Sequence, residues 1–583
     1  MITRSKTAVV GILCFAMVLT GAALAAIQSK SDLGEKSVGG RSGQLTFNKD
    51  IAPLLFENCA QCHRPGQAGP FSLLTYAEAK KHAKQIAEVT RKRYMPPWLA
   101  EPGYVEFAGE RRLSSDQIGA IQQWVAEGAV EGLPADLPPA PQWTEGWQLG
   151  RPDLIVPMPE AYTLPAGGKD VYRNFVMHIP VSTRRYVKSV EFLPGNWKTV
   201  HHAFITVDET GMSWRLADKG NPPGFDGMAL PETAKMPGGQ LLGWQPGKTP
   251  SVASPGLGWI LNKNTDLVLQ LHMHPTGKPE TVQPSVGFYF TDEPPTNFCF
   301  RINLTYLPID IPAGAKDYAV EESYTLPVDV DVLAVSPHTH YLGKQLEGYA
   351  ILPDGARKPL LLIKEWDFNW QGDYRYAKPV FLPKGTTLAM HFSYDNSAEN
   401  ARNPTQPPRR VKYGLQTTDE MGELFFQVLP RNAQERNILA DDFSRKLANY
   451  TIEYNEYLLR TNPNDAVAHT KVGRALVYLG RVAEGWGHLR SAVKANPDYD
   501  KAHYELGFVY LRQNRLPEAR SEFETVVRLN PEDYQAHGSL GSIWLRLGRL
   551  DEAESCFRTA LRINPDDVVA QKNLERLRKQ KRP

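Results

Sequence analysis

The sequence predicts a multidomain chain with an α-helical N-terminal domain, an all-β core and a C-terminal α-solenoid. Three observations lead to this prediction. The chain has 583 residues, more than a single hydrophobic core usually organises. Residues 160–435 read as short β-rich runs broken by Gly, Pro, Asn and Asp, which is typical of β-sandwiches. Residues 455–583 repeat at an interval of 34 residues, as stacked helical units do.

The first residues carry the features of an export signal. Arg4 and Lys6 form a positive segment ahead of an apolar stretch. Ala23-Leu24-Ala25 then provides the small-x-small cleavage pattern, so residues 1–25 are predicted to be a cleaved signal peptide. The alternative is an uncleaved membrane anchor, because Thr7–Ala26 is nearly long enough to span a bilayer. Both interpretations predict a protein that is periplasmic or otherwise exported.

Charge and cysteine content narrow the function classes. The net charge is +2, so the electrostatic field of the whole molecule does not indicate nucleic-acid binding. Of the five cysteines, Cys14 lies in the signal, and Cys59 and Cys62 belong to the motif described next. The remaining two, Cys299 and Cys556, fall in different predicted domains, so we expect no disulfide framework and read Cys299 as a buried thiol.

Cys59-Ala60-Gln61-Cys62-His63 has the C-x-x-C-H spacing of covalent haem attachment. In this motif the two thiols bind the haem vinyl groups and the adjacent imidazole ligates the iron. The alternative is a redox or zinc-binding C-x-x-C, but export and the following histidine favour haem. Residues 43–132 resemble the small c-type cytochromes, which implies an α-helical cytochrome c domain with one covalent haem c.

The second axial ligand of such a haem is expected downstream, on a loop. Met95 is the candidate, because the proline pair that follows makes a stiff loop and thioether ligation suits electron transfer. The alternatives are that Met95 is an ordinary core methionine, or that His82, in a lysine-rich helix, is the ligand. Ser114 and Gln117 form a capping box that predicts a last helix.

A proline-rich linker, residues 133–159, leads into the β region, which is rich in histidine. The histidines are His178, His201, His202, His272, His274, His338, His340 and His391. Six of these histidines fall in three groups, His201-His202, His272-x-His274 and His338-x-His340. The last two groups are H-x-H pairs, which on a strand place both imidazoles on one face. The adjacent residues His201 and His202 need a bulge to chelate one metal together. Many imidazoles without clustered carboxylates indicate zinc or copper, and spacing alone does not separate these metals.

Four segments carry a resemblance that does separate them. They are His201-His202-Ala203, Leu269-Gln270-Leu271-His272, Pro337-His338-Thr339-His340-Tyr341-Leu342-Gly343-Lys344 and Thr417-Thr418-Asp419-Glu420-Met421. In this order they resemble the type II copper, ascorbate-dependent monooxygenases, the family of peptidylglycine α-hydroxylating monooxygenase and dopamine β-monooxygenase. The resemblance implies a core of two jelly-roll-like β-sandwich subdomains, at residues 160–300 and 301–435, with one copper on each.

The resemblance also implies the ligands. The first copper, an electron relay, would take His201, His202 and His272. The second, which activates O₂, would take the catalytic set His338, His340 and Met421, whose soft sulfur favours Cu(I). The choice of Met421 rests on the D-E-M match, since chemistry alone does not distinguish it from other methionines, namely Met177, Met273 and Met390.

Three other histidines receive weaker assignments. His274 is read as a spare ligand or as a hydrogen-bonding partner of the first copper site. His178 and His391 are expected to be structural.

One departure from the family concerns the substrate. Peptide-amidating members anchor a substrate carboxylate with an Arg two residues before the first His of the H-T-H, and add an Asn and a Tyr two and four residues after the copper Met. Those positions hold Ser336, Glu423 and Phe425 here. The sequence therefore predicts an apolar or neutral small organic substrate.

The C-terminal region repeats four residue types at intervals of 34. They are Pro463, Pro497, Pro531 and Pro565; Gly473, Gly507 and Gly541; Ala468, Ala502 and Ala536; and His469, His503 and His537. This period resembles the tetratricopeptide repeat and predicts three units, Asn464–Asp566, followed by a capping helix. Such arrays present a concave groove to a protein or peptide partner. The repeated histidines are expected to be structural.

Together these features predict an exported copper- and haem-dependent monooxygenase that hydroxylates a C–H bond of a small organic molecule with O₂. Its electrons would come from an ascorbate-like donor or a periplasmic redox protein, with the haem as a relay. One alternative is a non-catalytic periplasmic scaffold that binds metal and haem and recruits a partner through its repeats. Another is a nitrite or nitrous-oxide reductase, but these need a blue-copper Cys or a larger histidine cluster, and Cys299 has no histidine shortly downstream.

Overall fold

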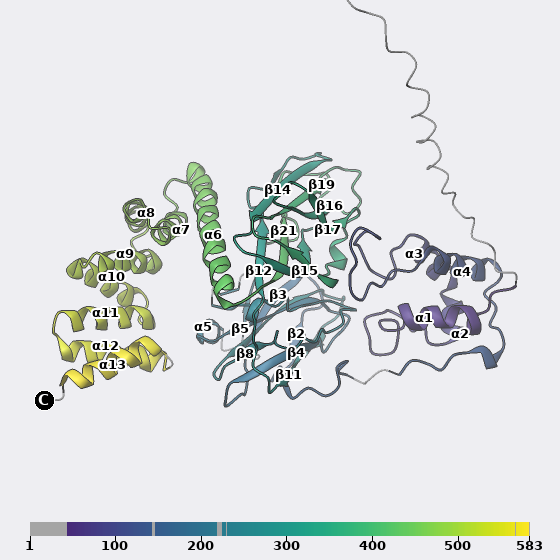
Figure 1. Cartoon of the computed structure of the whole chain (residues 1–583), viewed down its shortest axis with the longest axis horizontal. Coiled ribbons are helices and arrows are strands. Elements are labelled where there is room, and N and C mark those ends of the chain that lie inside the picture. Colours follow the sequence, from purple (N-terminus) through teal and green to yellow (C-terminus); the bar gives the residue numbers. More distant parts are fainter. Residues whose placement is uncertain are drawn as a thin grey trace, which may run out of the picture.

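The computed structural model places an N-terminal helical region, a β core and a C-terminal helical array next to one another along the longest axis (Figure 1). It describes residues 43–142, 146–217, 224–228, 230–231, 233–565 and 567–581. The predicted signal peptide, with Cys14, lies outside these residues. Within the described ranges, no helix is long and apolar enough to cross a membrane.

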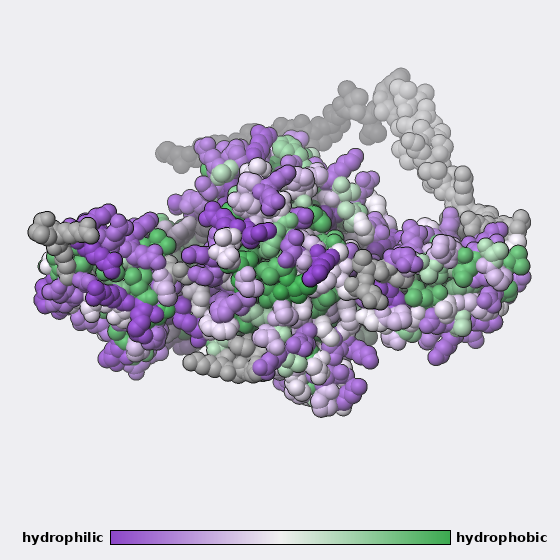
Figure 2. Space-filling view, turned by 90° about the horizontal axis from the view of Figure 1, so that it is seen from below, coloured by the Kyte–Doolittle hydropathy of each residue, from purple (hydrophilic) through white to green (hydrophobic). Residues whose placement is uncertain are grey.

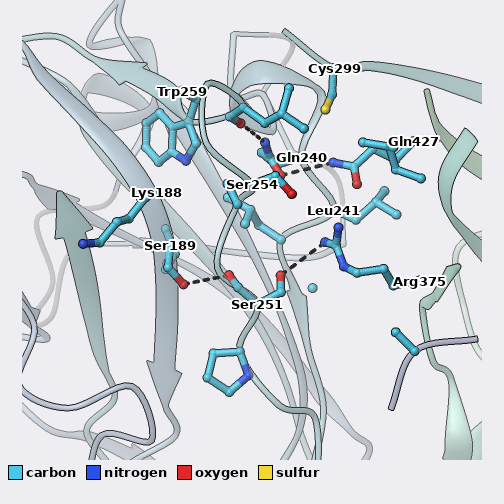
Figure 3. A pocket seen from close by; sticks show the side chains of 18 of the residues that line it. Lys188, Ser189, Gln240, Leu241, Ser251, Ser254, Trp259, Cys299, Arg375 and Gln427 are labelled. Atoms are coloured by element: carbon cyan, nitrogen blue, oxygen red, sulfur yellow. Dashed lines mark hydrogen bonds between the residues drawn. The ribbon is translucent and has the colours of Figure 1, made fainter. Parts of the chain in front are cut away.

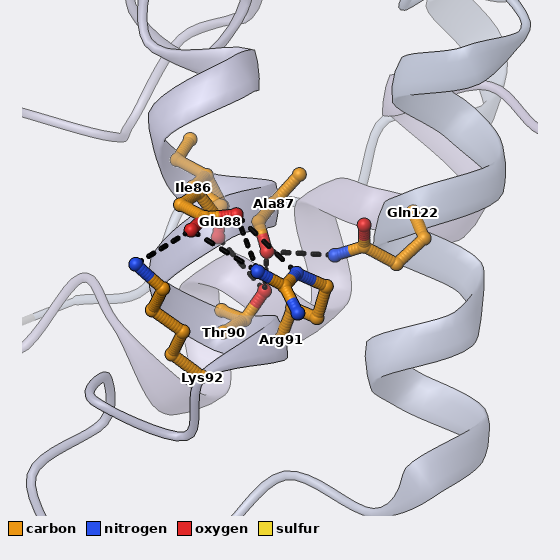
Figure 4. A network of polar contacts seen from close by, with 7 residues as sticks. All are labelled: Ile86, Ala87, Glu88, Thr90, Arg91, Lys92 and Gln122. Atoms are coloured by element: carbon orange, nitrogen blue, oxygen red, sulfur yellow. Dashed lines mark hydrogen bonds and ion pairs between the residues drawn. The ribbon is translucent and has the colours of Figure 1, made fainter.

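The N-terminal region is built from short helices around an apolar core. They are η1 (Phe47–Ile51), α1 (Ala52–Asn58), α2 (Tyr76–Lys81), α3 (Ala83–Arg91), α4 (Ser115–Ala126) and the 3₁₀ turn η2 (Pro134–Asp136). The predicted capping box at Ser114 is present, and fully buried Phe47 and Trp124 pack at the centre. The side-chain amide of Gln122 donates to the carbonyl of Ala87 at 2.7 Å and so ties α4 to α3 (Figure 4).

Strands β1 to β11 form the first sandwich, with a four-stranded sheet of order β1-β11-β4-β8 and a five-stranded sheet of order β6-β3-β9-β5-β7. Strands β10 and β2 form a separate two-stranded sheet. The strands are β1 (Leu154–Pro157), β2 (Tyr162–Leu164), β3 (Val171–His178), β4 (Arg185–Leu193), β5 (Val200–Asp208), β6 (Gly224–Asp226), β7 (Gly243–Trp244), β8 (Trp259–Leu261), β9 (Asp266–Met273), β10 (Glu280–Val282) and β11 (Ser285–Thr291), with the short helices α5 (Met212–Leu216) and η3 (Pro237–Gly239) between strands.

The second sandwich, β12 to β21, pairs two four-stranded sheets of orders β12-β21-β15-β18 and β14-β19-β16-β17. The strands are β12 (Phe300–Thr305), β13 (Asp310–Ile311), β14 (Tyr318–Thr325), β15 (Val330–His338), β16 (Gly343–Ile351), β17 (Arg357–Ile363), β18 (Tyr374–Leu382), β19 (Thr387–Tyr394), β20 (Val411–Lys412) and β21 (Glu423–Pro430), with the 3₁₀ turn η4 (Phe368–Trp370). Its separate apolar core explains why the region divides into two sandwiches.

Along residues 267–274, Leu or Met occupies every second position, and the structure gives the cause of this alternation. Strand β9 is central in its sheet, between β3 and β5, and is buried on both faces. Leu269 and Leu271 point into the core of the first sandwich, while His272 lies on the opposite face. One expectation was wrong: β9 ends at Met273 and β15 ends at His338, so His274 and His340 lie just past the strand ends.

The expected linker is shorter than residues 133–159. Leu154–Pro157 form β1, which pairs antiparallel with β11. Ahead of this strand, the backbone N–H groups of Gln148 and Leu149 donate to the carboxylate of Glu191. The end of the proline-rich segment therefore belongs to the first sandwich.

The C-terminal array begins with a helix that the repeat period did not predict. Helix α6 (Ala433–Thr461) starts well before residue 455 and packs on the second sandwich, where the hydroxyl of Tyr324 donates to Asp442 at 2.7 Å. The repeats follow as helix pairs and a final helix: α7 (Ala466–Tyr478), α8 (Val482–Ala495), α9 (Asp500–Arg512), α10 (Leu516–Leu529), α11 (Tyr534–Arg546), α12 (Leu550–Ile563) and α13 (Val568–Lys581).

Hydrogen bonds within the repeats explain why the same residue types recur at a constant interval along the chain. Nε2 of His469, His503 and His537 each donates to the carbonyl of the repeat proline six residues earlier, at 2.9–3.0 Å. In the final helix Gln571 makes the same bond to Pro565. The repeated histidines are thus structural, as expected. Polar side chains cover most of the face seen in Figure 2, with an apolar area over the middle of the β core.

Candidate functional site

The first histidine group, His201, His202 and His272, converges on one point. The register of β5 against β9 shifts between Val200 and His202, which is the bulge that the adjacent pair required. As a result Nδ1 of His202 lies 3.2 Å from Nδ1 of His201 and 3.3 Å from Nδ1 of His272. Three ring nitrogens this close are arranged to donate lone pairs to a single cation.

Asp170, which the sequence reasoning missed, orients this group. Its carboxylate accepts hydrogen bonds from Nε2 of His272 at 2.9 Å and from Nδ1 of His274 at 2.8 Å. The bond to Nε2 leaves Nδ1 of His272 unprotonated and available for a metal. His274 is therefore placed as a hydrogen-bonding partner of Asp170, and Asp170, His272 and His274 also form a second group whose ligand atoms could hold a metal ion. Asp170 immediately precedes β3, and no sequence pattern links it to residues a hundred positions away.

The electrostatics of the first group suit neutral ligands. Burial, with the neighbouring His272 and His274, lowers the pKa of His201 to about 3. Burial likewise lowers the pKa of His202 and of His272. Burial acts to raise the pKa of Asp170, but the hydrogen bonds from His272 and His274 outweigh it and hold that pKa below its usual range. Uncharged imidazoles beside a carboxylate form a set that favours a bound cation.

The second ligand group, His338, His340 and Met421, lies on the second sandwich. Nδ1 of His338 donates to Oε1 of Gln371 at 2.6 Å, and Nδ1 of His340 donates to the carbonyl of Asp419 at 3.1 Å. Both histidines therefore have an Nε2 lone pair free for a metal. Burial lowers the pKa of each to about 4. The donor set of two imidazoles and a thioether is one that copper accepts.

Glu420 joins the two loops that carry this second group. Its carboxylate has no exposed surface. It accepts hydrogen bonds from the hydroxyl of Thr339 at 2.7 Å and from the backbone N–H groups of Leu342, Met421 and His340. Burial raises the pKa of Glu420 to about 7, although these four donors act in the opposite direction. The D-E-M string contains this residue, but only the structure shows its role.

Both groups face one cavity of about 210 Å³, called here the shared cavity. Its wall includes His202 from the first group and all three members of the second. It also includes the three positions at which this sequence departs from the peptide-amidating pattern, Ser336, Glu423 and Phe425.

The charges on the shared cavity balance. The guanidinium of Arg301 and the carboxylate of Glu423 both line it, and the guanidinium lies over the ring of Phe425 at 5.4 Å. A third charged group, Asp373, is paired with Lys248 at 2.7 Å. Most of the remaining wall is apolar, with Met228, Met236 and Leu241 among its residues.

A second cavity, of about 450 Å³, surrounds the C-x-x-C-H motif. Cys59, Cys62, His63 and Met95 all line this Cys-His cavity. Nδ1 of His63 donates to the carbonyl of Phe71 at 3.1 Å, which leaves Nε2 free as a ligand. His82, the alternative ligand, is instead stacked on Phe71 at 3.7 Å and is not among the described residues of the wall.

Two polar groups on the wall of the Cys-His cavity bear on whether it fits a covalently held haem. Next to them, burial, with the nearby Cys62, raises the pKa of Cys59 to about 12. The side chain of Arg111 is on the wall, and Nε1 of Trp370 is a buried donor with no hydrogen-bond partner among the described residues. Both groups could meet the acidic propionates of a haem. The volume is in the usual range for cofactor sites.

A further cavity, of about 520 Å³, lies between the two sandwiches (Figure 3). Its polar groups are mostly satisfied within the protein. Arg375 donates to Ser251 at 3.2 Å, and Gln427 donates to Gln240 at 3.1 Å. No histidine is among the described residues on its wall, although its volume exceeds that of the shared cavity, so cavity volume does not identify the chemical site.

The remaining histidines of the β region lie elsewhere. His178 pairs with Asp266 at 2.5 Å, and His391 pairs with Glu321 at 2.9 Å. Neither is on the wall of the cavities described above. The buried Cys299 is 2% exposed, and burial raises its pKa to about 11.

The comparisons with known proteins concern the C-terminal array. The family model of the tetratricopeptide repeat matches residues 471–524 and 509–568. Residues 471–568 therefore form a tetratricopeptide region. No curated protein matches the chain.

Several solved structures resemble part of the chain. The crystal structure of MamA is 20% identical over 22% of this chain and 76% of that one, with a TM-score of 0.22. The first tetratricopeptide domain of Spaghetti (RPAP3), bound to the HSP90 peptide SRMEEVD, is 20% identical over 20% of this chain and 92% of that one, with a TM-score of 0.20. The MamA RS-1 ArsTM double mutant is 22% identical over 25% and 83%, with a TM-score of 0.23.

Proposed function

We propose that this chain is an exported copper- and haem-dependent monooxygenase that hydroxylates a C–H bond of a small organic substrate. One observation carries the proposal: an all-nitrogen group on one sandwich and a nitrogen–sulfur group on the other border the same cavity. A structural metal site needs only one closed group. Two open groups facing a cavity leave room for a substrate and for O₂.

When bound, copper would supply O₂ activation at the second group and electron storage at the first, and haem c would supply electrons. The chain's own residues hold and orient these groups. Asp170 presents Nδ1 of His272, Gln371 presents Nε2 of His338, and Glu420 fixes the loops of His340 and Met421. Each constraint is set before a metal arrives, which lowers the reorganisation needed on binding.

The substrate is proposed to carry no net charge. Arg301 and Glu423 on the shared cavity have opposite signs, and the neutral histidines add none. An anionic substrate would gain from Arg301 but would be repelled by Glu423, whereas an uncharged molecule meets the apolar part of the wall. A strong preference for carboxylate-bearing substrates would contradict this.

Cys59, Cys62 and His63, with Met95 as a further ligand, would hold the haem, which would supply electrons taken from an ascorbate-like compound or a periplasmic redox protein. The tetratricopeptide array is proposed to recruit a protein or peptide partner in its concave groove. That role is separable from the chemistry, because the repeats lie on the far side of α6 from the N-terminal region (Figure 1).

The first test is the metal content of the purified mature protein. We expect two copper ions per haem iron, with one copper lost in His272→Ala and one lost in Met421→Ala. His178→Ala and His391→Ala are matched controls on the same two sandwiches and should retain both. Iron without copper, or zinc in both groups, would contradict the monooxygenase and favour a non-catalytic scaffold.

A further inference from the structure

The β core completes the Cys-His cavity. The wall opposite the C-x-x-C-H motif is formed by Trp197, His201, Pro246, Asn369 and Trp370, all from the two sandwiches. The contact is close: a Cβ on Gly247 would lie 3.0 Å from Sγ of Cys62, and Arg111 donates to the carbonyl of Gly247 at 2.6 Å. A group attached at Cys59 and Cys62 would therefore be enclosed between the N-terminal region and the β core.

His201 belongs to two sites. Its Nδ1 is in the first histidine group, 3.2 Å from Nδ1 of His202, while its side chain lines the Cys-His cavity. The imidazole of His201 could therefore contact both a cofactor in the Cys-His cavity and a metal bound by the first histidine group. No other residue would need to lie between them.

The turn around η4 extends this contact to the second ligand group. The ring of Phe368 is stacked on His201 with centroids 6.0 Å apart, and its edge meets His340 at 5.7 Å. Next along the chain, Trp370 lines the Cys-His cavity and Gln371 holds His338. Phe368 is 2% exposed, so its ring separates His201 from His340 as buried protein and not as solvent.

The turn is also held rigidly. Oδ1 of Asp367 accepts hydrogen bonds from the backbone N–H of Asn369 at 3.0 Å and from its side-chain amide at 2.9 Å. The N–H of Trp370 donates to the carbonyl of Asp367 at 2.9 Å. A rigid turn keeps the distances between the Cys-His cavity and the two ligand groups fixed, and a fixed distance favours electron transfer between them.

We propose that the turn Phe368–Gln371 and His201 form the electron path from the haem to both copper groups, with Phe368 as the link between the groups. With both groups loaded, an electron would leave ferrous haem, which becomes ferric, and reduce copper(II) at the first group to copper(I); no bond forms or breaks. After the external donor has reduced the haem again, a second electron would pass through Phe368 and reduce copper(II) at the second group to copper(I). This rests on the proposed function, which supplies haem and copper.

The test uses the full chain loaded with haem and copper, without substrate or O₂. Oxidised protein is mixed with a limiting reductant, haem is followed by its absorbance, and copper(II) is followed by electron paramagnetic resonance in rapidly frozen samples. The variants are Trp370→Leu, at the haem side, and Phe368→Leu, between the copper groups. Phe392→Leu is a matched ring deletion in the core of the second sandwich, away from the path.

In the native chain we expect ferrous haem to decay, at a rate independent of protein concentration, as copper(II) is lost. Trp370→Leu should slow the loss of the copper(II) signal from both ligand groups several-fold. Phe368→Leu should slow only the loss of the copper(II) signal from the second ligand group. Phe392→Leu should behave as native. Ferric haem should also speed the relaxation of the copper(II) signal in native protein.

Native rates in both path variants, or no relaxation effect, would overturn the electron path while leaving the proposed function intact. Failure of the purified chain to bind haem or copper would instead defeat the proposed function, and the path with it. Metal content, measured first on every variant, separates the two cases.

Discussion

The hydroxyl of Thr339 donates a hydrogen bond to the buried carboxylate of Glu420 across 81 positions of sequence, at 2.7 Å. This bond joins the loop of the H-T-H string to the loop of the D-E-M string. It gives a physical reason for the two strings to occur together: one supplies two imidazoles, the other supplies the sulfur, and Glu420 fixes their relative position.

Replacing Glu420 by alanine should therefore be strongly destabilising. The change leaves four buried hydrogen-bond donors without an acceptor, and each lost partner costs about 1–3 kcal/mol. The free energy of unfolding of the β core should therefore fall by at least about 3 kcal/mol. Differential scanning calorimetry of the full chain measures this, and the copper at the second group should be lost with it. Glu321→Ala, at an exposed position on β14, should change neither. Native stability in Glu420→Ala would contradict the bridging role.

Asp170→Asn should weaken only the first group. An asparagine cannot hold Nε2–H of His272 with a charged acceptor, so the tautomer that frees Nδ1 is no longer favoured. We expect a loss of about 10–100-fold in copper affinity at this group, as removal of such partners usually produces. Competition with a copper chelator measures it. Asp292→Asn, exposed on the same sandwich, is the control; an unchanged affinity in Asp170→Asn would show that His272 is oriented by packing alone.

Met95→Ala should change the haem without preventing its attachment. Loss of the thioether ligand is expected to remove the sulfur–iron band from the visible spectrum and lower the reduction potential. Turnover with the natural donor should fall, while turnover with ascorbate should persist. His82→Ala, which removes the alternative ligand, should leave the spectrum as it is. The opposite pattern in the two variants would make His82 the ligand.

The ion pair of His503 with Glu522, at 2.6 Å, predicts a pH-dependent stability of the repeats. The hydrogen bond that His503 Nδ1 donates to the carboxylate of Glu522 raises the pKa of His503 above its ordinary value of 6.5. A raised pKa contributes stability that is complete below 6.5 and is lost as pH rises through the raised value. Glu522→Gln should thus cost about 1 kcal/mol at about pH 5 and less at about pH 9. Equal losses at both pH values, in thermal melts of the repeat transition, would contradict a charged pair.

A glycine pair tests the packing of the repeats. A Cβ on Gly541 would lie 2.7 Å from the ring of Phe557, so Gly541→Ala should cost about 1–3 kcal/mol through overpacking. Gly487, inside α8, has open space at the same position, and Gly487→Ala should stabilise by about 0.5–1 kcal/mol. The two melting temperatures should move in opposite directions. A tolerated Gly541→Ala would mean that the helix pair can separate.

The sequence determined the features that depend on near neighbours along the chain. A period of 34 residues identifies the helical array, because each repeat carries the same contacts, such as the bond from His503 to Pro497. Strand β9 and the need for a bulge at His201-His202 follow from side-chain alternation. The histidine candidates were also visible, because they occur in groups along the chain, whereas the choice of Met421 rested on the resemblance.

Only the tertiary structure decided which groups meet. Asp170, Gln371 and Phe368 have no sequence signal, and each lies far along the chain from one or more of the histidines that it contacts. The enclosure of the Cys-His cavity by His201 and Trp370 likewise joins separate domains. The physical reason is that local patterns report backbone periodicity and burial, whereas a site is made by side chains that packing of the whole chain brings within a few ångströms.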